Sequence, residues 1–439
     1  MGLPLPGHAV PAAVGGKPFV TAETVGTAPS PGGEGEPVRS LYVHAPFCPR
    51  RCPYCDFAVT VAAGGDAEGW IGALAAELAW IRREGPLAPA RELDTLFVGG
   101  GTPSHLGPEA MGMLGRLLGR ERLAAPGLEW TAEANPDSFT RQVAEGWAEA
   151  GVNRVSLGAQ SFHDGALRWM GRLHGKEGTA RAVEEARRAG MGNLSVDLLF
   201  GLPPGVERDW DRDLEAALTL EVPHLSLYGL SVEEGTPLER DVREGRESPP
   251  EEERYRDEFL RAADVLSAAG YRHYEVSNFA LPGFEARHNL ACWSLRPYLG
   301  LGNSAHSYLH PVRRWNLRRW DAYQRSVQGG GSPLAGHEIV EGEAARLERI
   351  WMALRTAAGL PTDDLPTRAR RRVEAWRTRG WARSLEERDE AGREVRRGGW
   401  GRGKGRVRLT PEGWLLLDEL ALELDGALET AEAVEPPRG

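Results

Sequence analysis

The sequence predicts an α/β fold: a full or partial barrel of parallel strands, followed by a small α-rich, winged-helix-like C-terminal domain. Short runs rich in β-forming residues alternate with segments of helical apolar spacing, and repeated strand–helix units of this kind build parallel sheets. Chemically unusual residues follow the ends of several predicted strands, where barrel proteins place their functional groups. From about residue 335 the alternation stops, which marks the second part of the chain.

The barrel prediction rests on six short strands, each a run of β-branched, aromatic and aliphatic residues. They lie at 40–44, 94–98, 128–134, 153–159, 194–200 and 224–230. Amphipathic helices are predicted between them, for example at 67–84 and 175–190. Ahead of the first strand, residues 1–37 are rich in Gly, Pro, Ala and Thr without any period, which predicts a disordered tail.

The C-terminal part is predicted to contain helices at 347–360 and 409–424, the second with the Thr-Pro pair typical of a helix start. Basic, tryptophan-bearing stretches and a Gly-rich hairpin lie between them, a combination that resembles a winged-helix domain. Such domains often bind nucleic acid, and the arginine cluster permits it. Acidic residues interleave with the basic ones, however, and the net charge of the chain is −10. A solvated or partner-facing surface is therefore favoured, and no nucleic acid is expected.

The composition is that of a globular chain of two or three domains: 439 residues, of which 41% are hydrophobic and 26% charged. No run of about 18 uncharged apolar residues occurs, so no transmembrane segment is predicted. The N-terminus lacks the charged, apolar and cleavage regions of a secretory signal. Four cysteines, three of them clustered, do not look like a disulfide framework. In a reducing cytosol such a cluster more often binds metal, and a cytoplasmic location is predicted.

Three cysteines fall within the stretch HAPFCPRRCPYCDF at 44–57, with the spacing C-x3-C-x2-C at Cys48, Cys52 and Cys55. Structural zinc needs four closed ligands, whereas three thiolates on a [4Fe–4S] cluster leave one iron without a protein ligand. That open iron could hold and polarise a small chelating molecule. Zinc with His44 as the fourth ligand, and cysteines that bind no metal, are the two alternatives that the spacing leaves open.

Glycines and polar residues gather at the carboxyl ends of the predicted strands. Glycines 99–101 and Thr102 follow the second strand, where missing side chains let a ligand approach backbone N–H groups. Later strand ends and the GRLH segment add Glu133, Gln160, Arg172 and Asp197. Taken singly, each has an ordinary interpretation as a turn, a cap or a surface charge. Together on one rim they supply the carboxylate, backbone groups and cationic or amide donors that a sulfonium nucleoside needs.

The cysteine spacing, with the aromatic Tyr54 between the last two thiols, resembles the signature of the radical S-adenosyl-L-methionine (SAM) superfamily. In that superfamily the open iron of a [4Fe–4S] cluster chelates the methionyl amino and carboxylate groups of SAM. The resemblance implies a partial (β/α)6 TIM-like barrel with Cys48, Cys52 and Cys55 as cluster ligands. It also implies contacts to SAM, or to a second small molecule beside it, from Tyr42, Phe57, Gly100, Gly101, Thr102, Glu133, Gln160, Arg172 and Asp197.

Within that superfamily, residues 38–425 resemble the oxygen-independent coproporphyrinogen III oxidases and, more closely, the haem chaperone HemW. The motifs that carry this resemblance are YVHAPFCPRRCPYCDF, FVGGGTPSHL, TAEANPDSFT, RVSLGAQSF, GRLH, NLSVDLLFGLP and LYGLSVEEGTPL. Two features favour the chaperone branch. The oxidases carry a further cysteine two residues after the third, where this chain has Phe57 as the chaperones do. The chaperones also carry an HNxxYW segment that is implicated in haem binding.

The corresponding segment is HNLACW at 288–293, and imidazole is a usual axial ligand of haem iron, so His288 is the predicted haem ligand. An ordinary core or loop histidine is the alternative, because most histidines bind no metal. The chain departs from the family pattern at Cys292, which replaces the tyrosine and puts any role of that tyrosine in doubt. A thiolate can ligate haem or a cluster, but a free cysteine is usually a small buried apolar side chain, and that interpretation is favoured.

The resemblance implies a haem chaperone that binds haem, a [4Fe–4S] cluster and SAM. Such a chaperone transfers haem to a membrane-associated haem-accepting protein and has no oxidase activity. The first alternative is the oxidase itself, a radical enzyme that decarboxylates coproporphyrinogen propionates, and a nucleic-acid-modifying radical enzyme is the second. The expected division is a tail at 1–37, a radical SAM barrel at 38–280, a haem-motif segment at 281–335 and a HemN-type accessory domain at 336–430.

Overall fold

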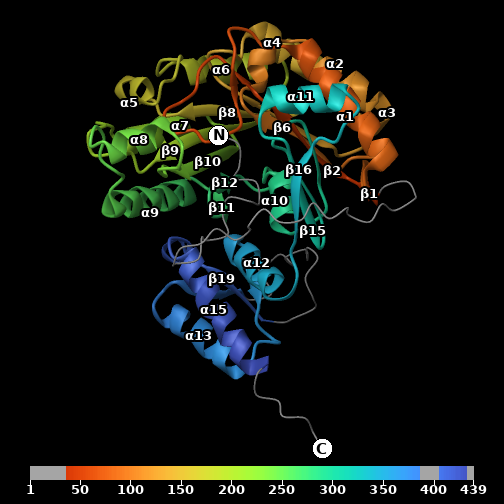
Figure 1. Cartoon of the computed structure of the whole chain (residues 1–439). Coiled ribbons are helices and arrows are strands. Elements are labelled where there is room, and N and C mark those ends of the chain that lie inside the picture. The colour runs from red at the N-terminus through yellow and green to blue at the C-terminus, as the bar shows by residue number, and fades with distance from the viewer. Residues whose placement is uncertain (1–35, 386–404, 433–439) are drawn as a thin grey trace, which may run out of the picture.

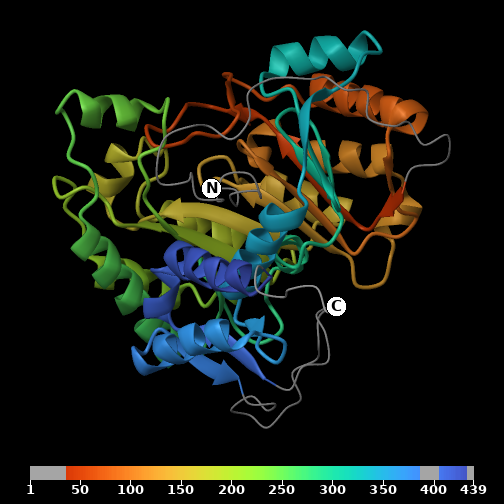
Figure 2. The same ribbon diagram turned by 60° about the horizontal axis from the view of Figure 1, so that its bottom comes forward.

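The computed structural model describes residues 36–385 and 405–432. They form a large α/β part and a smaller C-terminal part (Figures 1 and 2). The predicted disordered tail lies outside the described residues except at its last two positions. Those two join Val38 in strand β1 (Glu36–Val38), which pairs in parallel with β5 (Leu87–Pro89), so regular structure extends two residues into the predicted tail.

Six parallel strands form the centre of a nine-stranded sheet and follow one another in space as they do in the sequence (Figure 1). They are β2 (Ser40–Ala45), β6 (Thr95–Gly100), β7 (Glu129–Ala134), β8 (Arg154–Gln160), β9 (Asn193–Phe200) and β10 (His224–Gly229). All six predicted strands are confirmed, to within two residues at each end.

The two ends of the sheet are extended by strands that the sequence did not predict. β13 (Leu299–Leu301) pairs in parallel with β2, while β12 (Asn278–Ala280) and then β11 (Arg272–Glu275) continue the sheet antiparallel beside β10. The strand order is linear, with β11 and β13 at its ends, so the sheet is a partial barrel rather than a closed one.

Helices lie in the connections that follow the parallel strands, and the longer ones cover one face of the sheet. They are α1 (Ala67–Glu84), α2 (Ala110–Leu118), α3 (Arg120–Leu123), α4 (Arg141–Ala150), α5 (Asp164–Trp169), α6 (Gly178–Arg188), α7 (Trp210–Thr219), α8 (Pro237–Arg243) and α9 (Glu252–Ala268). Local sequence sets their ends. α1 starts where Asp66 accepts a hydrogen bond from Gly69 N at 2.8 Å, and α4 stops at Gly151, whose φ of 103° suits glycine.

The two faces of the sheet differ in polarity. In β7, Trp130 is fully buried and packs on the helix side close to Gly115 of α2. Glu129, Thr131 and Glu133 alternate with it, so they point to the opposite, inward face. Inward positions of barrels are usually filled by branched apolar residues. The polar inward face of this sheet therefore suggests a site for a ligand rather than a packed core.

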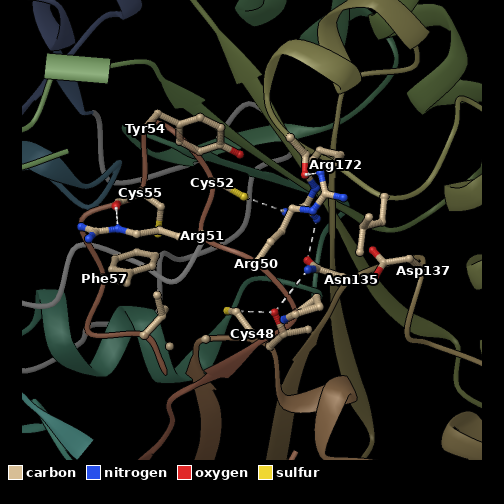
Figure 3. Close-up of a pocket in the computed structure, with 17 residues that line it drawn as sticks. Cys48, Arg50, Arg51, Cys52, Tyr54, Cys55, Phe57, Asn135, Asp137 and Arg172 are labelled. Atoms are coloured by element: carbon tan, nitrogen blue, oxygen red, sulfur yellow. Dashed lines mark hydrogen bonds between the residues drawn. The ribbon is translucent and has the colours of Figure 1, made fainter. Parts of the chain in front are cut away.

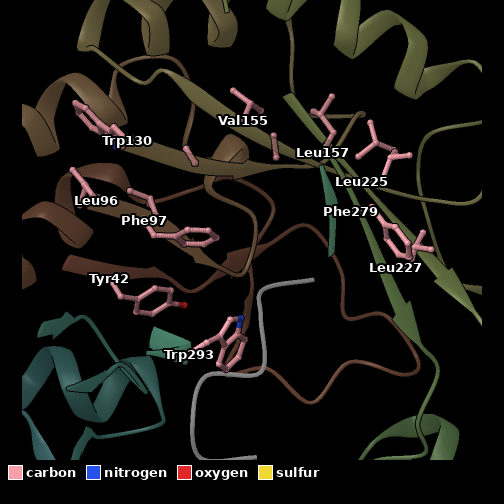
Figure 4. Close-up of a cluster of buried hydrophobic side chains, with 14 of the residues drawn as sticks. Tyr42, Leu96, Phe97, Trp130, Val155, Leu157, Leu225, Leu227, Phe279 and Trp293 are labelled. Carbon is pink, nitrogen blue, oxygen red and sulfur yellow. The ribbon is translucent and has the colours of Figure 1, made fainter. Parts of the chain in front are cut away.

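Aromatic residues occupy part of the inward face. Tyr42 of β2 and Phe97 of β6 stack with their ring centroids 6.1 Å apart. Figure 4 shows both rings turned toward Trp293, while Leu96 and Trp130 belong to the helix side. The inward face thus carries aromatic rings at β2 and β6, whereas from β7 onward it carries carboxylates and other polar side chains.

Residues 281–335 form short elements beside β2. They are α10 (Arg287–Trp293), β13, β14 (His306–Leu309), β15 (Val312–Asn316) and α11 (Trp320–Gln328), and β16 (Leu334–Ile339) completes an antiparallel sheet with β14 and β15. Glu77 of α1 holds this segment in place. Its carboxylate accepts hydrogen bonds from Gly302 N at 2.7 Å, Asn316 Nδ2 at 2.6 Å and Tyr323 Oη at 2.6 Å. Burial raises the pKa of Glu77 to about 7, and these donors oppose that rise.

The C-terminal part combines helices with a small antiparallel sheet, as predicted. It contains α12 (Gly342–Arg355), β17 (Leu360–Pro361), α13 (Thr367–Thr378), β18 (Ala382–Leu385), β19 (Arg406–Leu409), α14 (Pro411–Trp414) and α15 (Leu417–Glu432). The helix predicted at 347–360 lies about five residues earlier in the sequence. The one predicted at 409–424 is interrupted after Trp414 and runs further. Part of the predicted basic, tryptophan-bearing stretches, within residues 386–404, lies outside the described residues.

The C-terminal part is attached to the sheet at β11. Ala357 N donates to the Tyr274 carbonyl at 2.8 Å, and Val276 N donates to the Arg355 carbonyl at 3.1 Å. Arg355 Nε also lies 3.1 Å from Glu275 Oε2, and both side chains are buried. The accessory helices are therefore fixed to one edge of the partial barrel. None of the helices in residues 36–385 and 405–432 is long and apolar enough to cross a membrane.

Candidate functional site

The cysteine loop leaves the carboxyl end of β2 and is closed at its base by two short strands. β3 (Phe47–Cys48) pairs in parallel with β4 (Thr60–Val61). Within the loop, Cys55 N donates to the Cys52 carbonyl at 3.2 Å, which folds the segment between these cysteines into a turn. The side chains of all three cysteines, Cys48 included, line one pocket (Figure 3).

Two glycines at the end of β6 let the cysteine loop pack tightly against that strand. Gly100 has a φ of 108°, and a side chain there would overlap the His44 ring. A Cβ atom on Gly101 would lie 2.7 Å from the carbonyl oxygen of Ala45. A larger residue at either position would push the start of the cysteine loop away from the sheet.

The backbone N–H groups of Gly100, Gly101 and Thr102 have partners within the chain. They donate, in that order, to Glu133 Oε2 at 3.1 Å, the Ala45 carbonyl at 2.8 Å and the Phe47 carbonyl at 2.8 Å. The expectation that these N–H groups are open to a ligand is therefore wrong. The glycines serve the packing of the cysteine loop, and only their outer surface faces the pocket.

The pocket has an empty volume of about 600 Å³, part of which is open solvent. It is bounded by the cysteine loop, the end of β6 and the segments that follow β7 and α5. Eight of the predicted site residues line it: Cys48, Cys52, Cys55, Phe57, Gly100, Gly101, Thr102 and Arg172. The prediction that the motifs meet on one rim is confirmed for these eight.

Arg172 and Asn135 connect the thiols to the strand ends (Figure 3). Arg172 Nη1 lies 3.9 Å from Cys52 Sγ, and Nη2 donates to Asn135 Oδ1 at 2.5 Å. Asn135 Nδ2 donates to Thr102 Oγ1 at 3.2 Å, and that hydroxyl lies 3.3 Å from Cys48 Sγ. The guanidinium and the amide thus join two of the three thiols to the ends of β6 and β7.

Comparison with known proteins identifies the family. The profile of the Radical SAM superfamily matches residues 42–217. The chain is 36% identical to the Mycobacterium tuberculosis protein named Heme chaperone HemW, over 80% of this chain and 90% of the relative. The chain belongs to the HemW family. Its identity to the Escherichia coli protein of the same name is 37%, over 62% of this chain and 70% of the relative.

Other relatives of the HemW-family chain agree with its fold. A Bos taurus protein named Radical S-adenosyl methionine domain-containing protein 1, mitochondrial, is 32% identical over 92% of this chain and 90% of the relative. The structure of HemN, the coproporphyrinogen III oxidase of Escherichia coli, superposes with a TM-score of 0.69 at 22% identity. That match covers 89% of this chain and 90% of HemN. At that identity the likeness shows a shared fold alone.

Membership of the radical SAM superfamily implies a [4Fe–4S] cluster and SAM, and the pocket fits a cluster better than a zinc ion. In residues 36–385 and 405–432, no three His, Cys, Asp or Glu side chains converge closely enough to hold one metal ion. The irons of a cluster instead take thiolates at separate corners. His44, the fourth ligand of the zinc alternative, has both ring nitrogens engaged, Nδ1 with Tyr42 Oη at 3.0 Å and Nε2 with the Ala58 carbonyl at 3.1 Å. The zinc alternative is therefore disfavoured.

The partly buried thiols suit a cationic partner. Burial raises the pKa of Cys48 to about 12 and that of Cys55 to about 11. A bound metal ionises its thiol ligands outright and so offsets the cost of burying their charge. Together with the Arg172 guanidinium near Cys52, these thiols fit a cluster site better than a reactive thiolate exposed to solvent.

Four predicted SAM contacts lie on the inward face of the sheet and are not part of the pocket lining: Tyr42, Glu133, Gln160 and Asp197. Asp197 accepts hydrogen bonds from Ser156 Oγ at 3.0 Å and Ser195 Oγ at 3.2 Å. Burial, and then the charge of Asp197, raises the pKa of Glu133 to about 7. The contact of these residues with SAM stays a prediction.

Gln160 carries an unusual feature that sequence could not indicate. Its backbone φ is 70°, a strained value for a residue other than glycine, and its side chain is fully buried. Neither atom of its terminal amide has a hydrogen-bond partner among the described residues. A buried amide without partners, held at the end of β8, is suited to a polar ligand that reaches the inward face.

Sequence reasoning assigned no role to four polar residues of the pocket, Arg50, Arg51, Asn135 and Asp137, and the last two belong to one motif. Both follow Glu133 in the TAEANPDSFT motif, at the end of β7. The signal was present, because strand ends of a partial barrel point to the functional rim. From this motif, only Glu133 within the strand was predicted as a site residue, and Asn135 and Asp137 just beyond the strand were not.

His288 lies away from this pocket. Its Nδ1 is 2.9 Å from Thr95 Oγ1, at the first residue of β6, whereas the cysteine pocket is at the last. The side chain is buried, and burial lowers its pKa to about 3. Cys292, on the same helix, is buried against Tyr298 and Tyr308. The favoured interpretation of Cys292 as a buried apolar side chain is therefore confirmed.

The fourth cysteine provides a matched control for the cluster assignment. We expect Cys52→Ala to lose most of the iron and the brown absorbance of the anaerobically reconstituted protein, because the cluster then has only two thiolate ligands. Cys292→Ala, the same chemical change in a buried side chain outside the pocket, should retain both. Iron analysis and visible spectra of the two variants test this. Full iron content in the Cys52 variant would contradict the assignment.

Proposed function

We propose that the chain is a haem chaperone, which binds haem through His288 and passes it to a haem-accepting protein. The HemW relatives support this proposal, since their printed name is Heme chaperone HemW and one of them is covered over 90% of its length. The observation that carries it is the position of the HNLACW segment. This segment forms α10, which lies at the amino ends of the parallel strands, whereas the cysteine pocket lies at their carboxyl ends.

The length of strand β6 gives the separation between the His288 ring and the cysteine pocket. Thr95, which contacts His288, is its first residue, and Gly100, which lines the pocket, is its last. Five residues of a parallel strand rise by about 16 Å. In this position the His288 ring therefore lies well outside the reach of a radical formed in the cysteine pocket. This arrangement favours haem as a molecule that is bound and passed on unchanged, rather than as the substrate of radical chemistry.

The hydrogen bond of the His288 ring determines which of its nitrogens would ligate a metal once the ring is accessible. A ring that donates its Nδ1 proton to Thr95 Oγ1 presents the lone pair of Nε2. Nε2 is buried and has no hydrogen-bond partner among the described residues. Such a hydrogen bond sets the tautomer, so Nε2 is the nitrogen that is left to ligate iron.

The proposal includes the protein that receives haem and the cellular compartment of this chain. The recipient is a membrane-associated haemoprotein, as the family resemblance implies. The chain itself is cytoplasmic, because three free cysteines that hold a cluster require a reducing compartment. SAM and the cluster support the transfer of haem and do not modify it.

Haem titration tests the ligand assignment. We expect His288→Ala to weaken haem binding by tenfold or more, because removal of even an outer partner of a metal ligand costs about 10–100-fold in affinity. His306→Ala, the same change in a histidine outside α10, should bind haem as the parent does. The Soret band measured against haem concentration gives both affinities. An unchanged affinity in the His288 variant would contradict the assignment, and its iron–sulfur content should be unchanged in either case.

A second assay separates the chaperone from the oxidase. Phe57 lines the pocket at the position where the oxidases carry a further cysteine. We expect no decarboxylation when the cluster-loaded protein is incubated anaerobically with SAM, a reductant and coproporphyrinogen III, followed by mass spectrometry of the tetrapyrroles. The cluster is measured in the same tube to show that it stays intact. The loss of two carboxyl groups per molecule would establish the enzyme instead.

A further inference from the structure

Helix α10 is held at its start by a carboxylate from the barrel rather than by its own sequence. Its N-cap residue, Ala286, has no side chain that can accept a hydrogen bond. Glu129, the first residue of β7, takes that place: its Oε2 accepts from Arg287 N at 3.1 Å and its Oε1 from His288 N at 3.0 Å. The unsatisfied N–H groups at the start of a helix and the helix dipole both favour a negative charge there.

The neighbouring strand holds the same helix through a side chain. Thr95 pairs with Glu129 in the register of β6 and β7, and its hydroxyl lies 2.9 Å from His288 Nδ1. The His288 ring also lies against Phe97, with centroids 5.3 Å apart. Two adjacent strand starts therefore hold both the backbone and the side chain of the proposed haem ligand.

Two further contacts complete the attachment of α10. Tyr274 Oη accepts a hydrogen bond from Ala286 N at 3.2 Å, just before the helix. At the other end, the Arg355 guanidinium of α12 lies 4.0 Å from the centre of the Trp293 ring. Cation–π contacts of this kind are strongest where water is excluded, and both side chains are buried. Both ends of α10 are thus held by elements outside the segment.

While α10 is attached to the strand starts, His288 is not accessible to haem. His288 is 1% exposed, so its Nε2 atom is covered by protein. An iron ligand must come within about 2.0–2.1 Å of the metal, the bond length of imidazole–metal contacts, and the porphyrin around the iron is wide and flat. The position of α10 in this structure therefore does not permit haem ligation. For haem to bind, the helix has to leave the strand starts.

We infer that Glu129 and Thr95 form a latch that stores α10 against the barrel, and that haem binding requires the latch to open. This inference rests on the proposed function, because it takes His288 as the haem ligand. A ligand that binds only the released state has its apparent affinity reduced by the fraction of molecules in that state. The latch therefore lowers haem affinity, which lets a chaperone give haem up to its recipient when α10 returns to the barrel.

Glu129→Gln is the variant that weakens the latch most directly. The amide keeps one oxygen but turns an N–H donor toward the backbone N–H groups of α10, and it removes the negative charge. Since hydrogen bonds to a charged group are the stronger ones, we expect about a tenfold larger released fraction. Hydrogen–deuterium exchange of peptides over 286–293 should speed up by about that factor. The apparent dissociation constant for haem should fall by the same factor, because both report one population.

Two more variants complete the test, one that weakens the latch at a second residue and one that serves as a control. Thr95→Val removes only a hydroxyl at nearly constant volume and should act in the same direction, which guards against a folding defect of the Glu129 variant. Asp209→Asn changes another capping carboxylate, which accepts from Arg212 N at the start of α7 at 3.2 Å, and should alter neither measurement. Unchanged exchange in α10, or faster exchange with equal or weaker haem binding, would overturn the latch. If instead His288→Ala leaves haem binding unchanged while Glu129→Gln speeds exchange, the proposed ligand fails and the attachment of α10 stands.

Discussion

The parallel direction of the six central strands is the constraint on which the rest of the structure depends. Since β2, β6, β7, β8, β9 and β10 run the same way in sequential order, their carboxyl ends meet on one rim and their amino ends on the other. The cysteine loop, the glycines and Arg172 gather on the first rim, although they come from distant parts of the chain. The haem-motif helix contacts the second. The parallel direction of the strands thus separates the cysteine pocket from the His288 helix within a single sheet.

Alternation along each strand adds a second division, between the apolar helix side and the polar inward face. Burying carboxylates such as Glu133 and Asp197 is costly unless hydrogen bonds or positive charge offset the desolvation. Hydrogen bonds from Ser156 and Ser195 supply part of that compensation at Asp197. At Glu133, burial raises the pKa to about 7, and the hydrogen bond from Gly100 N opposes that rise. A cationic ligand on the inward face would supply the remainder, which fits the sulfonium that the superfamily uses.

Sequence predicts the features that depend on local pattern. The six strands follow from short β-rich runs, and the cysteine pocket follows from one compact motif. Features set by long-range packing were not predictable. The N–H groups of Gly100 and Gly101 are used by other parts of the chain, because the cysteine loop folds back onto β6. The position of His288 depends on Glu129 and Thr95, which lie more than 150 residues earlier in the sequence. A motif identifies that histidine, but only the fold reveals that it is buried at the far rim.

The location of the haem iron tests the central claim of this account, that His288 and not the cysteine pocket holds haem. The measurement is an anomalous iron map from crystals of the protein loaded with both groups. We expect a cluster peak beside Cys48, Cys52 and Cys55 and a separate single-iron peak bonded to Nε2 of His288, away from the cysteine pocket. A haem iron stacked over the cysteine pocket, or bonded to a residue outside α10, would contradict the account.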